Sequence, residues 1–157
     1  MSKTTRATQA LAKAGVSFTV HAYDYDPSAE KVGMQAAVAL GETPGRVLKT
    51  LMAEVDGRPV CVIVPSDREV SMKKLAAAFR GKTASMMKPA DAERLTGYHV
   101  GGISPFGQRK AVPTVLEEQA LAHAAVYING GQRGLQVRLS PVDARNTLKA
   151  VAASVVA

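Results

Sequence analysis

The chain has 157 residues, of which 46% are hydrophobic, 21% charged and 4% aromatic, a balance that indicates one globular domain over residues 1–157. A single cysteine, Cys61, excludes an internal disulfide, and the lack of a long apolar run excludes a signal peptide or a membrane span, so we expect a cytoplasmic protein. The net charge of +7 fits a polyanionic partner and a solvated basic surface equally well.

Helices and strands alternate in the first half of the predicted structure. From the N-terminus, the apolar pattern predicts a helix over residues 2–14, a strand over 18–22, a helix over 34–40 and a helical turn that begins at Thr43 and Pro44. Two strands follow, over residues 47–53 and 60–64, with the hairpin signal Asp56-Gly57 between them. The second of these strands is continuously apolar, which predicts burial on both faces of a sheet.

The second half mixes the two kinds of element again. We expect helices over residues 71–81 and 89–95 and after Ser140-Pro141, and strands over residues 83–87, 114–116, 124–129 and 135–139. Residues 151–157 are expected to fray. The mixed order with several hairpins predicts an α/β (α+β) fold, a mixed β-barrel-like sheet surrounded by helices, and not a doubly wound parallel sheet.

Lys49 is the first candidate site residue, because it stands in the middle of an otherwise apolar predicted strand. Side-chain alternation along a strand places it on the same face as Val47 and Leu51. A lysine on a buried face costs free energy unless it is paired or lines a cleft. The alternative is a lysine on an edge strand, where its charge prevents aggregation. The pattern alone leaves both interpretations open.

Two glycine-rich segments are further candidates. Residues 101–107 contain three glycines and a proline, and such a loop can bring backbone N–H and C=O groups close to a ligand. Gln108, Arg109 and Lys110 follow directly and are of the types that contact phosphates. An ordinary loop followed by a solvated charge run is the alternative. The second segment, residues 129–134, is typical of a hairpin turn.

Several kinds of site are excluded by what the sequence lacks. His21, His99 and His123 are widely spaced and have no cysteine or carboxylate set with zinc-ligand spacing. Cys61 lies in a predicted buried strand, where packing is a more frequent role than nucleophilic attack. There is no Gly-x-Ser-x-Gly elbow, Walker phosphate loop or dinucleotide fingerprint. A hydrolase built on this sequence would therefore work without a metal and without a serine triad.

Four motifs in order carry a resemblance to a known family. They are His21-x-Tyr23-x-x-Asp26-Pro27, Lys49-Thr50-Leu51, the segment Thr96 to Gln108 with Gly101-Gly102-Ile103-Ser104-Pro105 at its centre, and the segment Tyr127 to Leu135. Together with the length and the element order, they resemble the YbaK/EbsC family, free-standing relatives of the editing domain that is inserted in bacterial prolyl-tRNA synthetases. The resemblance covers nearly the whole chain.

The resemblance implies a β-barrel-like sheet with surrounding helices and a trans-editing activity. Prolyl-tRNA synthetase cannot fully exclude cysteine, because a pocket rejects a competitor of similar size only weakly. The family's YbaK branch removes cysteine from tRNA for proline, and the resemblance extends the expected substrates to tRNA for cysteine; neighbouring branches remove alanine. The implied partners are aminoacyl-tRNA and prolyl-tRNA synthetase, and the resemblance implies no metal and no cofactor.

Site residues follow from the matching positions. Lys49 resembles the family's essential lysine, which would hold a phosphate or the ribose of the terminal nucleotide, or stabilise charge at the ester. Gly101 and Pro105 resemble the ends of the family's Gly-x-x-x-Pro loop, whose backbone groups would bind the aminoacyl group in the manner of an oxyanion hole. Gly102, Ile103 and Ser104 lie between them.

Four more positions are expected to contact substrate. Tyr23 and Thr50 match positions that line the family's site. Asn129 stands where relatives are expected to carry a small hydroxyl residue, and Val32 where they are expected to carry an aromatic one. These two departures leave the shape of the pocket wall open.

No side chain in the sequence is an obvious nucleophile, and the family suggests that the substrate's own thiol attacks its ester. The protein would then supply positioning and electrostatics. Two alternatives remain: an alanyl-tRNA(Pro) deacylase of the same fold, and a tRNA- or synthetase-binding module without catalysis. The size of the pocket near Tyr23, Val32 and Asn129 would separate cysteine from alanine specificity.

Overall fold

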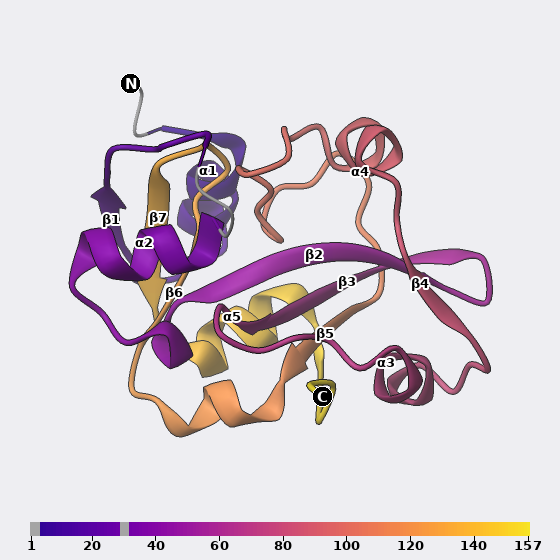
Figure 1. The fold of residues 1–157 in the computed structure, drawn as a ribbon. Helices are drawn as coiled ribbons and strands as arrows, with labels where there is room; N and C mark the ends of the chain where they lie inside the picture. The colour runs from indigo at the N-terminus through magenta and orange to yellow at the C-terminus, as the bar shows by residue number, and fades with distance from the viewer. Residues whose placement is uncertain (1–3, 29–31) are drawn as a thin grey trace.

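Two β-sheets and the helices around them make up the computed structural model, which describes residues 4–28 and 32–157 (Figure 1). One sheet is antiparallel, in the order β1 (Thr19–Ala22), β7 (Leu135–Leu139) and β6 (Val126–Asn129). The other is mixed, in the order β4 (Ala84–Met86), β2 (Leu48–Val55), β3 (Arg58–Pro65), β5 (Thr114–Glu117) and β8 (Val151–Ala153). The helices are α1 (Arg6–Lys13), α2 (Val32–Leu40), α3 (Met72–Ala78), α4 (Pro89–Thr96) and α5 (Pro141–Leu148), with short 3₁₀ helices η1 (Pro44–Arg46) and η2 (Glu118–Ala122).

Local sequence signals explain where several elements begin and end. The β2–β3 hairpin turns at Asp56 and Gly57, whose φ angles of 49° and 80° suit a tight two-residue turn. The Ser71 hydroxyl caps α3 by accepting a hydrogen bond from the Lys74 N–H. Gly97 ends α4 with a φ of 80°, a conformation that costs glycine little. Local sequence therefore sets these three boundaries, and the one at Gly97 begins the loop at residues 97–108.

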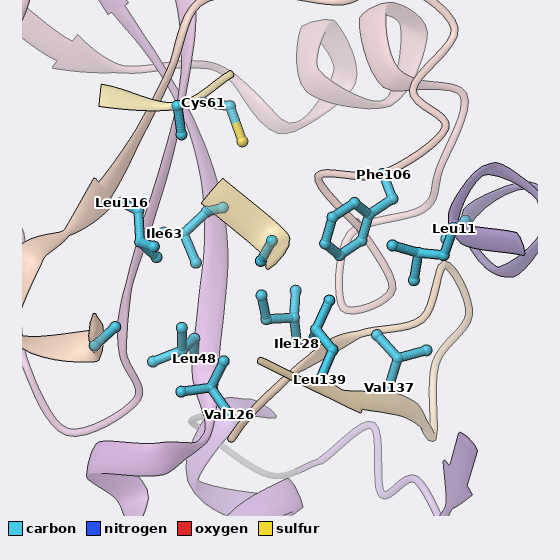
Figure 2. Packing of buried hydrophobic residues seen from close by; sticks show 14 of the residues in the cluster. Leu11, Leu48, Cys61, Ile63, Phe106, Leu116, Val126, Ile128, Val137 and Leu139 are labelled. Atoms are coloured by element: carbon cyan, nitrogen blue, oxygen red, sulfur yellow. The ribbon is translucent and has the colours of Figure 1, made fainter. Parts of the chain in front are cut away.

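The main core joins both sheets to α1 and to that loop. Ile63 and Leu116 face Ile128 across the sheets, and Phe106 reaches from the loop towards Leu11 of α1 (Figure 2). Phe106 is 2% exposed, and burying an aromatic ring of this size contributes on the order of 2 kcal/mol. The loop is therefore anchored in the core by a side chain that points away from the protein surface.

Strand β2 connects the two sheets and leaves part of one edge open. It pairs with β3 along its whole length, from Leu48 to Val55. On its other edge, the preceding residue Val47 bridges Tyr127 of β6, and β4 pairs only with residues 53–55. Between these points, residues 48–51 have no strand partner on this edge among the described residues. This unpaired stretch leaves a space beside the N-terminal half of β2.

The structure confirms the predicted mixed α/β fold and changes some of its details. Within the described residues the barrel-like sheet is open, since β6 meets β2 only at the Val47–Tyr127 bridge. The first helix begins at Arg6 and not near residue 2, because Thr5 and Thr8 form a capping box; residues 1–3 lie outside the described part. None of the helices in the described part is both long and apolar enough to cross a membrane.

The expectation that residues 151–157 fray is wrong. Strand β8 pairs in parallel with β5, and the N–H groups of Val155 and Val156 donate hydrogen bonds of 2.8 Å and 3.3 Å to the carboxylate of Glu117. Glu117 is fully buried, so these bonds satisfy a group that is costly to leave unpaired. A long-range contact that no local pattern shows holds the tail in place.

Candidate active site

A cleft of about 380 Å³ lies beside the open edge of β2. Its walls are β2 on one side, β4 and the start of α4 on a second, and the loop at residues 97–108 on a third, with β6 and β7 also contributing side chains. Other hollows on the surface are as large, at about 420 Å³ and 620 Å³. The chemistry of its lining, rather than its size, distinguishes the cleft. Of the predicted site residues, it brings together Lys49, Thr50, Gly101, Ile103 and Asn129.

Lys49 extends from β2 into the cleft. Its side chain is 21% exposed, and its Nζ lies 3.8 Å from Oε1 of Glu69, which is 73% exposed. An ion pair at this distance and exposure contributes little to stability. Lys49 does stand on a free strand edge, as the alternative interpretation required, but that edge is the wall of a cleft. Its positive charge is therefore available to an anionic group that enters.

Two buried polar atoms of the cleft have no hydrogen-bond partner among the described residues: Oγ1 of Thr50 and Oε1 of Gln136. Gln136 is 3% exposed. A buried polar atom without a partner costs about 1–3 kcal/mol, so most are satisfied in native proteins. Unpaired atoms beside a cleft lysine indicate a place where a ligand completes the hydrogen bonding.

Tyr23 lies behind this wall and does not line the cleft. Its hydroxyl is also buried without a hydrogen bond of normal geometry among the described residues. Burial raises the pKa of Tyr23, and the neighbouring side chain of Gln136 partly offsets this. Tyr23 therefore neighbours Gln136 and lies outside the lining of the cleft.

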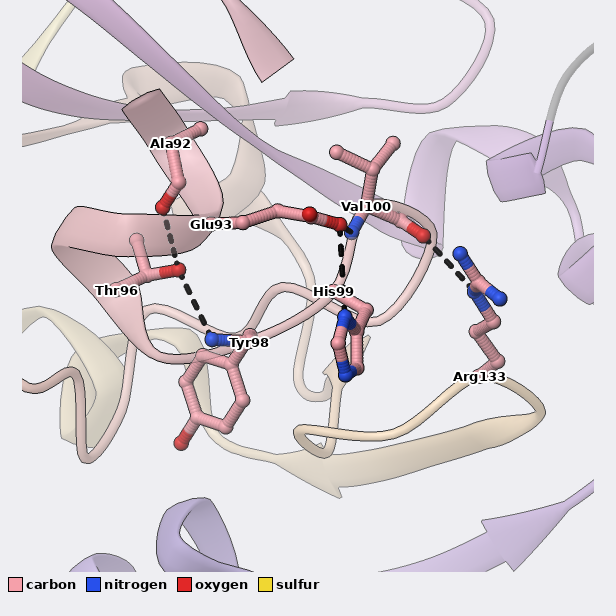
Figure 3. Close-up of polar contacts among 7 residues, drawn as sticks. All are labelled: Ala92, Glu93, Thr96, Tyr98, His99, Val100 and Arg133. Atoms are coloured by element: carbon pink, nitrogen blue, oxygen red, sulfur yellow. Dashed lines mark hydrogen bonds and ion pairs between the residues drawn. The ribbon is translucent and has the colours of Figure 1, made fainter. Parts of the chain in front are cut away.

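The loop wall is clamped on both sides of Val100, directly before Gly101 (Figure 3). The Glu93 carboxylate of α4 accepts a 2.8 Å hydrogen bond from the Val100 N–H, and Nε of Arg133 donates a 2.9 Å bond to the Val100 carbonyl. Thr96 adds a third contact, because its hydroxyl accepts from the N–H of Tyr98 at 3.1 Å. The backbone that enters the cleft at Gly101 is thus held by side chains from two other elements.

Gly101 and Gly102, the two adjacent glycines of this loop, have different structural roles. Gly101 has a φ of 92°, and a Cβ there would lie 2.8 Å from the hydroxyl of Tyr25. A Cβ on Gly102 would lie 2.7 Å from the backbone nitrogen of Arg133, so only glycine allows this approach. The Gly102 N–H is already bonded to the His99 carbonyl at 2.8 Å. The N–H groups of Gly101 and Ile103 form no hydrogen bond among the described residues, and both residues line the cleft.

Ser104 and Pro105 face away from the cleft. Ser104 is fully buried, and its Oγ accepts a 3.2 Å hydrogen bond from the N–H of Phe106. Pro105 lines a separate hollow on the other side of the loop, together with Ala10 and Thr147. The structure therefore places these two predicted contact residues, like Gly102, where they hold the loop.

Asn129 both lines the cleft and braces two of its walls. Its Oδ1 accepts hydrogen bonds from the N–H groups of Gly131 at 2.7 Å and Gln132 at 3.3 Å. Its Nδ2 donates a 3.4 Å bond to the carbonyl of Gly101. The prediction of a contact role for Val32 is not resolved: it is the first residue of α2, and its side chain lies outside what the structure describes.

Neither Ser66 nor Cys61 is placed to act as a nucleophile in the cleft. The hydroxyl of Ser66, which lines it, donates a hydrogen bond to the carbonyl of Val47. Cys61 is buried in β3, where burial raises the pKa of its thiol to about 12. The described part also has no group of three His, Cys, Asp or Glu residues that could hold a metal ion.

Sequence reasoning missed Gln136, Glu69 and the two methionines Met86 and Met87 that line the cleft. Gln136 carries a signal that could have been used, because it is a polar residue between Leu135 and Val137 in a short apolar strand. Glu69 has no such signal, since it is one of several charged residues in a connecting segment. Only the meeting of β3 and β2 at the cleft brings it to Lys49.

Comparison with known sequences gives a consistent result. The sequence profile described as aminoacyl-tRNA editing domain matches residues 26–147. The protein named "Putative Cys-tRNA(Pro)/Cys-tRNA(Cys) deacylase EbsC" of Enterococcus faecalis is 40% identical over 115 residues, which are 73% of this chain and 68% of that protein. A proline--tRNA ligase of Geobacillus thermodenitrificans is 30% identical over 101 residues, which are 64% of this chain but only 17% of the ligase.

Solved structures show the same fold. A protein described as "a putative trans-editing enzyme for prolyl tRNA synthetase" superposes with a TM-score of 0.82 at 22% identity, over 97% of this chain and 95% of that one. A hypothetical protein superposes with a TM-score of 0.87 at 23% identity, over 98% of this chain and 100% of the other. At these identities the likeness concerns the fold and not the activity.

Proposed function

The chain belongs to the aminoacyl-tRNA editing domain family, and from this premise we propose that it is a deacylase that removes cysteine from mischarged tRNA for proline. Cysteine on its own tRNA is the expected second substrate. The observation that carries the proposal is the cleft that Lys49 shares with the unpartnered atoms of Thr50 and Gln136 and with Gly101 and Ile103, whose N–H groups form no hydrogen bond among the described residues. A positive charge, hydrogen-bond acceptors and backbone donors are what an aminoacyl ester on a nucleotide requires.

The polar groups of the cleft suit different parts of this substrate. Oε1 of Gln136 and Oγ1 of Thr50 can each accept a hydrogen bond, which fits the α-ammonium group of the amino acid or a ribose hydroxyl. Lys49 is suited to a phosphate or to the ester oxygen that gains charge. The loop that carries the N–H groups of Gly101 and Ile103 is held in place at Val100, and backbone donors of this kind stabilise the oxyanion of a tetrahedral intermediate.

We infer that the nucleophile comes from the substrate. The thiol sulfur of the bound cysteine attacks its own ester carbonyl, the new C–S bond closes a cyclic thioester, and the C–O bond to the ribose breaks. The thiol proton ends on the ribose oxygen, so the tRNA leaves with a free hydroxyl. Water then opens the thioester to release cysteine. This route requires only positioning and charge stabilisation from the protein.

The same route accounts for selectivity in a pocket that cannot reject alanine by size. The cleft is lined by apolar side chains, among them Leu51, Met52 and Met86, which accept a small apolar or thiol-bearing group. A pocket of this kind discriminates weakly against a smaller side chain. Alanine has no thiol, so it can bind without reacting by this route.

The test compares cysteine, serine and alanine esters on tRNA for proline, with wild type, Lys49→Ala and the control Lys73→Ala, which changes an exposed lysine of α3. We expect cysteine release to fall at least 100-fold in Lys49→Ala and to be unchanged in Lys73→Ala. Serine should bind without turnover. Equal release of cysteine and serine would contradict the thiol route and favour a positioned water.

Two other results would change the assignment. Release of alanine instead of cysteine would make the protein an alanyl-tRNA(Pro) deacylase with the same site. Binding of tRNA with no release from any ester would leave a non-catalytic tRNA- or synthetase-binding module.

We also propose that the protein acts in the cytoplasm and selects its tRNA together with prolyl-tRNA synthetase. The cleft reads the aminoacyl end, which is common to all tRNAs charged with cysteine, so discrimination of the tRNA body needs a further source. Addition of the synthetase should then raise the rate on cysteinyl-tRNA for proline more than on cysteinyl-tRNA for cysteine. Equal effects on both would exclude this role.

A further inference from the structure

Two arginines from distant parts of the chain meet outside the cleft, above Gly97 at the end of α4. A Cβ on Gly97 would lie 2.5 Å from Nη1 of Arg6 and 3.5 Å from Nε of Arg109, so both guanidinium groups share the space that the glycine leaves. The backbone fixes both positions, because Arg6 opens α1 and the N–H of Arg109 donates a 2.9 Å hydrogen bond to the Thr96 carbonyl.

No carboxylate pairs with these two guanidinium groups in the part of the chain that the structure describes. Among the described residues, neither Arg6 nor Arg109 forms an ion pair. Arg6 instead donates a 2.8 Å hydrogen bond to the Gly107 carbonyl and lies over the ring of Tyr98, 5.5 Å from its centre. Two like charges held close together repel each other. The C-terminal end of α4 offsets part of this repulsion, because the helix dipole is negative there.

The carboxylates nearby are engaged elsewhere or stand apart. Asp91 is paired with Arg94, and Glu93 holds the N–H of Val100 and the ring of His99. Glu54 lies in the same hollow as Arg109 but with no ion pair to it among the described residues. The uncompensated charge therefore remains with Arg6 and Arg109, both exposed to solvent.

The pair adjoins the candidate active site. Arg109 lines a hollow of about 420 Å³ together with Arg94 and Lys110, and this hollow shares Met87 with the cleft. The loop at residues 97–108 also connects them, since Gly101 lines the cleft and Gly97 and Gly107 contact Arg6. The hollow, whose lining includes three basic and two acidic side chains, therefore adjoins the cleft at Met87.

We propose that Arg6 and Arg109 form a binding site for a backbone phosphate of the tRNA substrate. Guanidinium groups bind phosphate through paired, charge-assisted hydrogen bonds, and an anion between them removes their repulsion. Such contacts position a nucleic acid without reading its sequence. The inference rests on the proposed function only in naming tRNA as the ligand, and it assigns a site beyond the one where the ester reacts.

The test measures binding of uncharged tRNA for proline between 50 and 200 mM salt, for wild type, Arg109→Gln and the control Lys73→Gln. In Figure 1, α3, which carries Lys73, and α4 lie on opposite sides of the β2–β3 hairpin. We expect Arg109→Gln to raise the Kd about tenfold, the loss of one charge-assisted bond. The slope of log Kd against log salt should fall by about 0.7–0.9, the value for one phosphate. Lys73→Gln should change neither.

A second substrate separates this site from the reaction. Cysteine esterified to adenosine carries no backbone phosphate, so Arg109→Gln should hydrolyse it at the wild-type rate. Equal Kd and salt slope for Arg109→Gln and Lys73→Gln would overturn the proposal. If Arg109→Gln lowers the Tm and changes nothing else, the role of Arg109 is to stabilise the end of α4. Wild type that binds no tRNA would overturn it as well. If wild type binds tRNA through Arg109 but hydrolyses no ester, the phosphate site stands and the proposed deacylase function fails.

Discussion

The two main walls of the cleft are held in different ways. The β2 wall, with Lys49 and Thr50, is positioned by the main-chain ladder to β3, which does not depend on which side chains the strand carries. The loop wall, with Gly101 and Ile103, has no ladder and is positioned by the side chains of Glu93 and Arg133.

This difference predicts two kinds of defect. A substitution on a strand wall should remove a chemical group and leave the fold intact. A substitution in the loop wall should move the backbone donors and change activity and stability together. Residues of the loop that never touch the ligand can therefore matter as much as those that do.

The largest effect is expected from Gly102→Ala. The added Cβ would lie 2.7 Å from the Arg133 nitrogen and 2.9 Å from the Gln132 carbonyl carbon, both backbone atoms that cannot move independently. We expect a loss of at least 100-fold in kcat/KM and a destabilisation of about 1–3 kcal/mol, measured by kinetics and urea unfolding. Gly45→Ala is the matched control, because its Cβ would meet no atom within 4 Å. Wild-type activity in Gly102→Ala would show that the loop approach is not needed.

Gln136→Met should separate activity from stability on a strand wall. The change conserves volume and removes an unpaired acceptor together with the polar neighbour of the Tyr23 hydroxyl, so we expect the free energy of unfolding to change by no more than about 1 kcal/mol. KM for the cysteinyl ester should rise about tenfold, the value of one hydrogen bond to a charged group. Gln9→Met, at an exposed position of α1, is the control. A large fall in stability with unchanged KM would make Gln136 a structural residue.

Variants of Glu93 test whether its hydrogen bond to the Val100 N–H acts by positioning the loop. Glu93→Ala removes the acceptor for the Val100 N–H and should lower kcat about fivefold to tenfold, with a loss of stability of about 1 kcal/mol. Glu93→Gln keeps an acceptor oxygen and should restore most of the activity. If both variants behave alike, the negative charge and not the hydrogen bond is what the loop requires.

The smallest effect on activity is expected from Cys61→Ala. Burial raises the pKa of this thiol to about 12, so it stays protonated at neutral pH and should react with iodoacetamide only after unfolding. The substitution should cost about 1–2 kcal/mol in packing and leave kcat unchanged. Rapid labelling of the native protein with loss of activity would contradict this.

The raised thiol pKa also has a consequence for stability in alkali. In the unfolded chain the thiol ionises near pH 9, whereas the folded protein keeps the proton up to about pH 12. The contribution of Cys61 is therefore fully present below pH 9 and is lost as the pH rises between these values. Cys61→Ala should weaken the fall in Tm over this range.

Much of the fold follows from local sequence signals. The hairpin at Asp56-Gly57 lies where the sequence predicts it, and the helices that follow Ser71 and precede Gly97 lie close to their predicted ranges, because each end depends on the conformational preference of one or two residues. Lys49 also stood out, since a charge in an apolar strand is unusual in any fold. The motifs around Gly101 and Asn129 identified the two segments that line the cleft together with Lys49.

Only the tertiary structure decided which residues of those segments face the cleft. Gly102, Ser104 and Pro105 lie in the same motif as Gly101, but they support the loop from its buried side. Gln136 joins the cleft because β7 pairs with β6, and the tail at residues 151–157 is ordered because Glu117 binds it from 38 positions away. Local preferences act over a few residues and determine elements, whereas the facing of side chains depends on packing between elements distant in sequence.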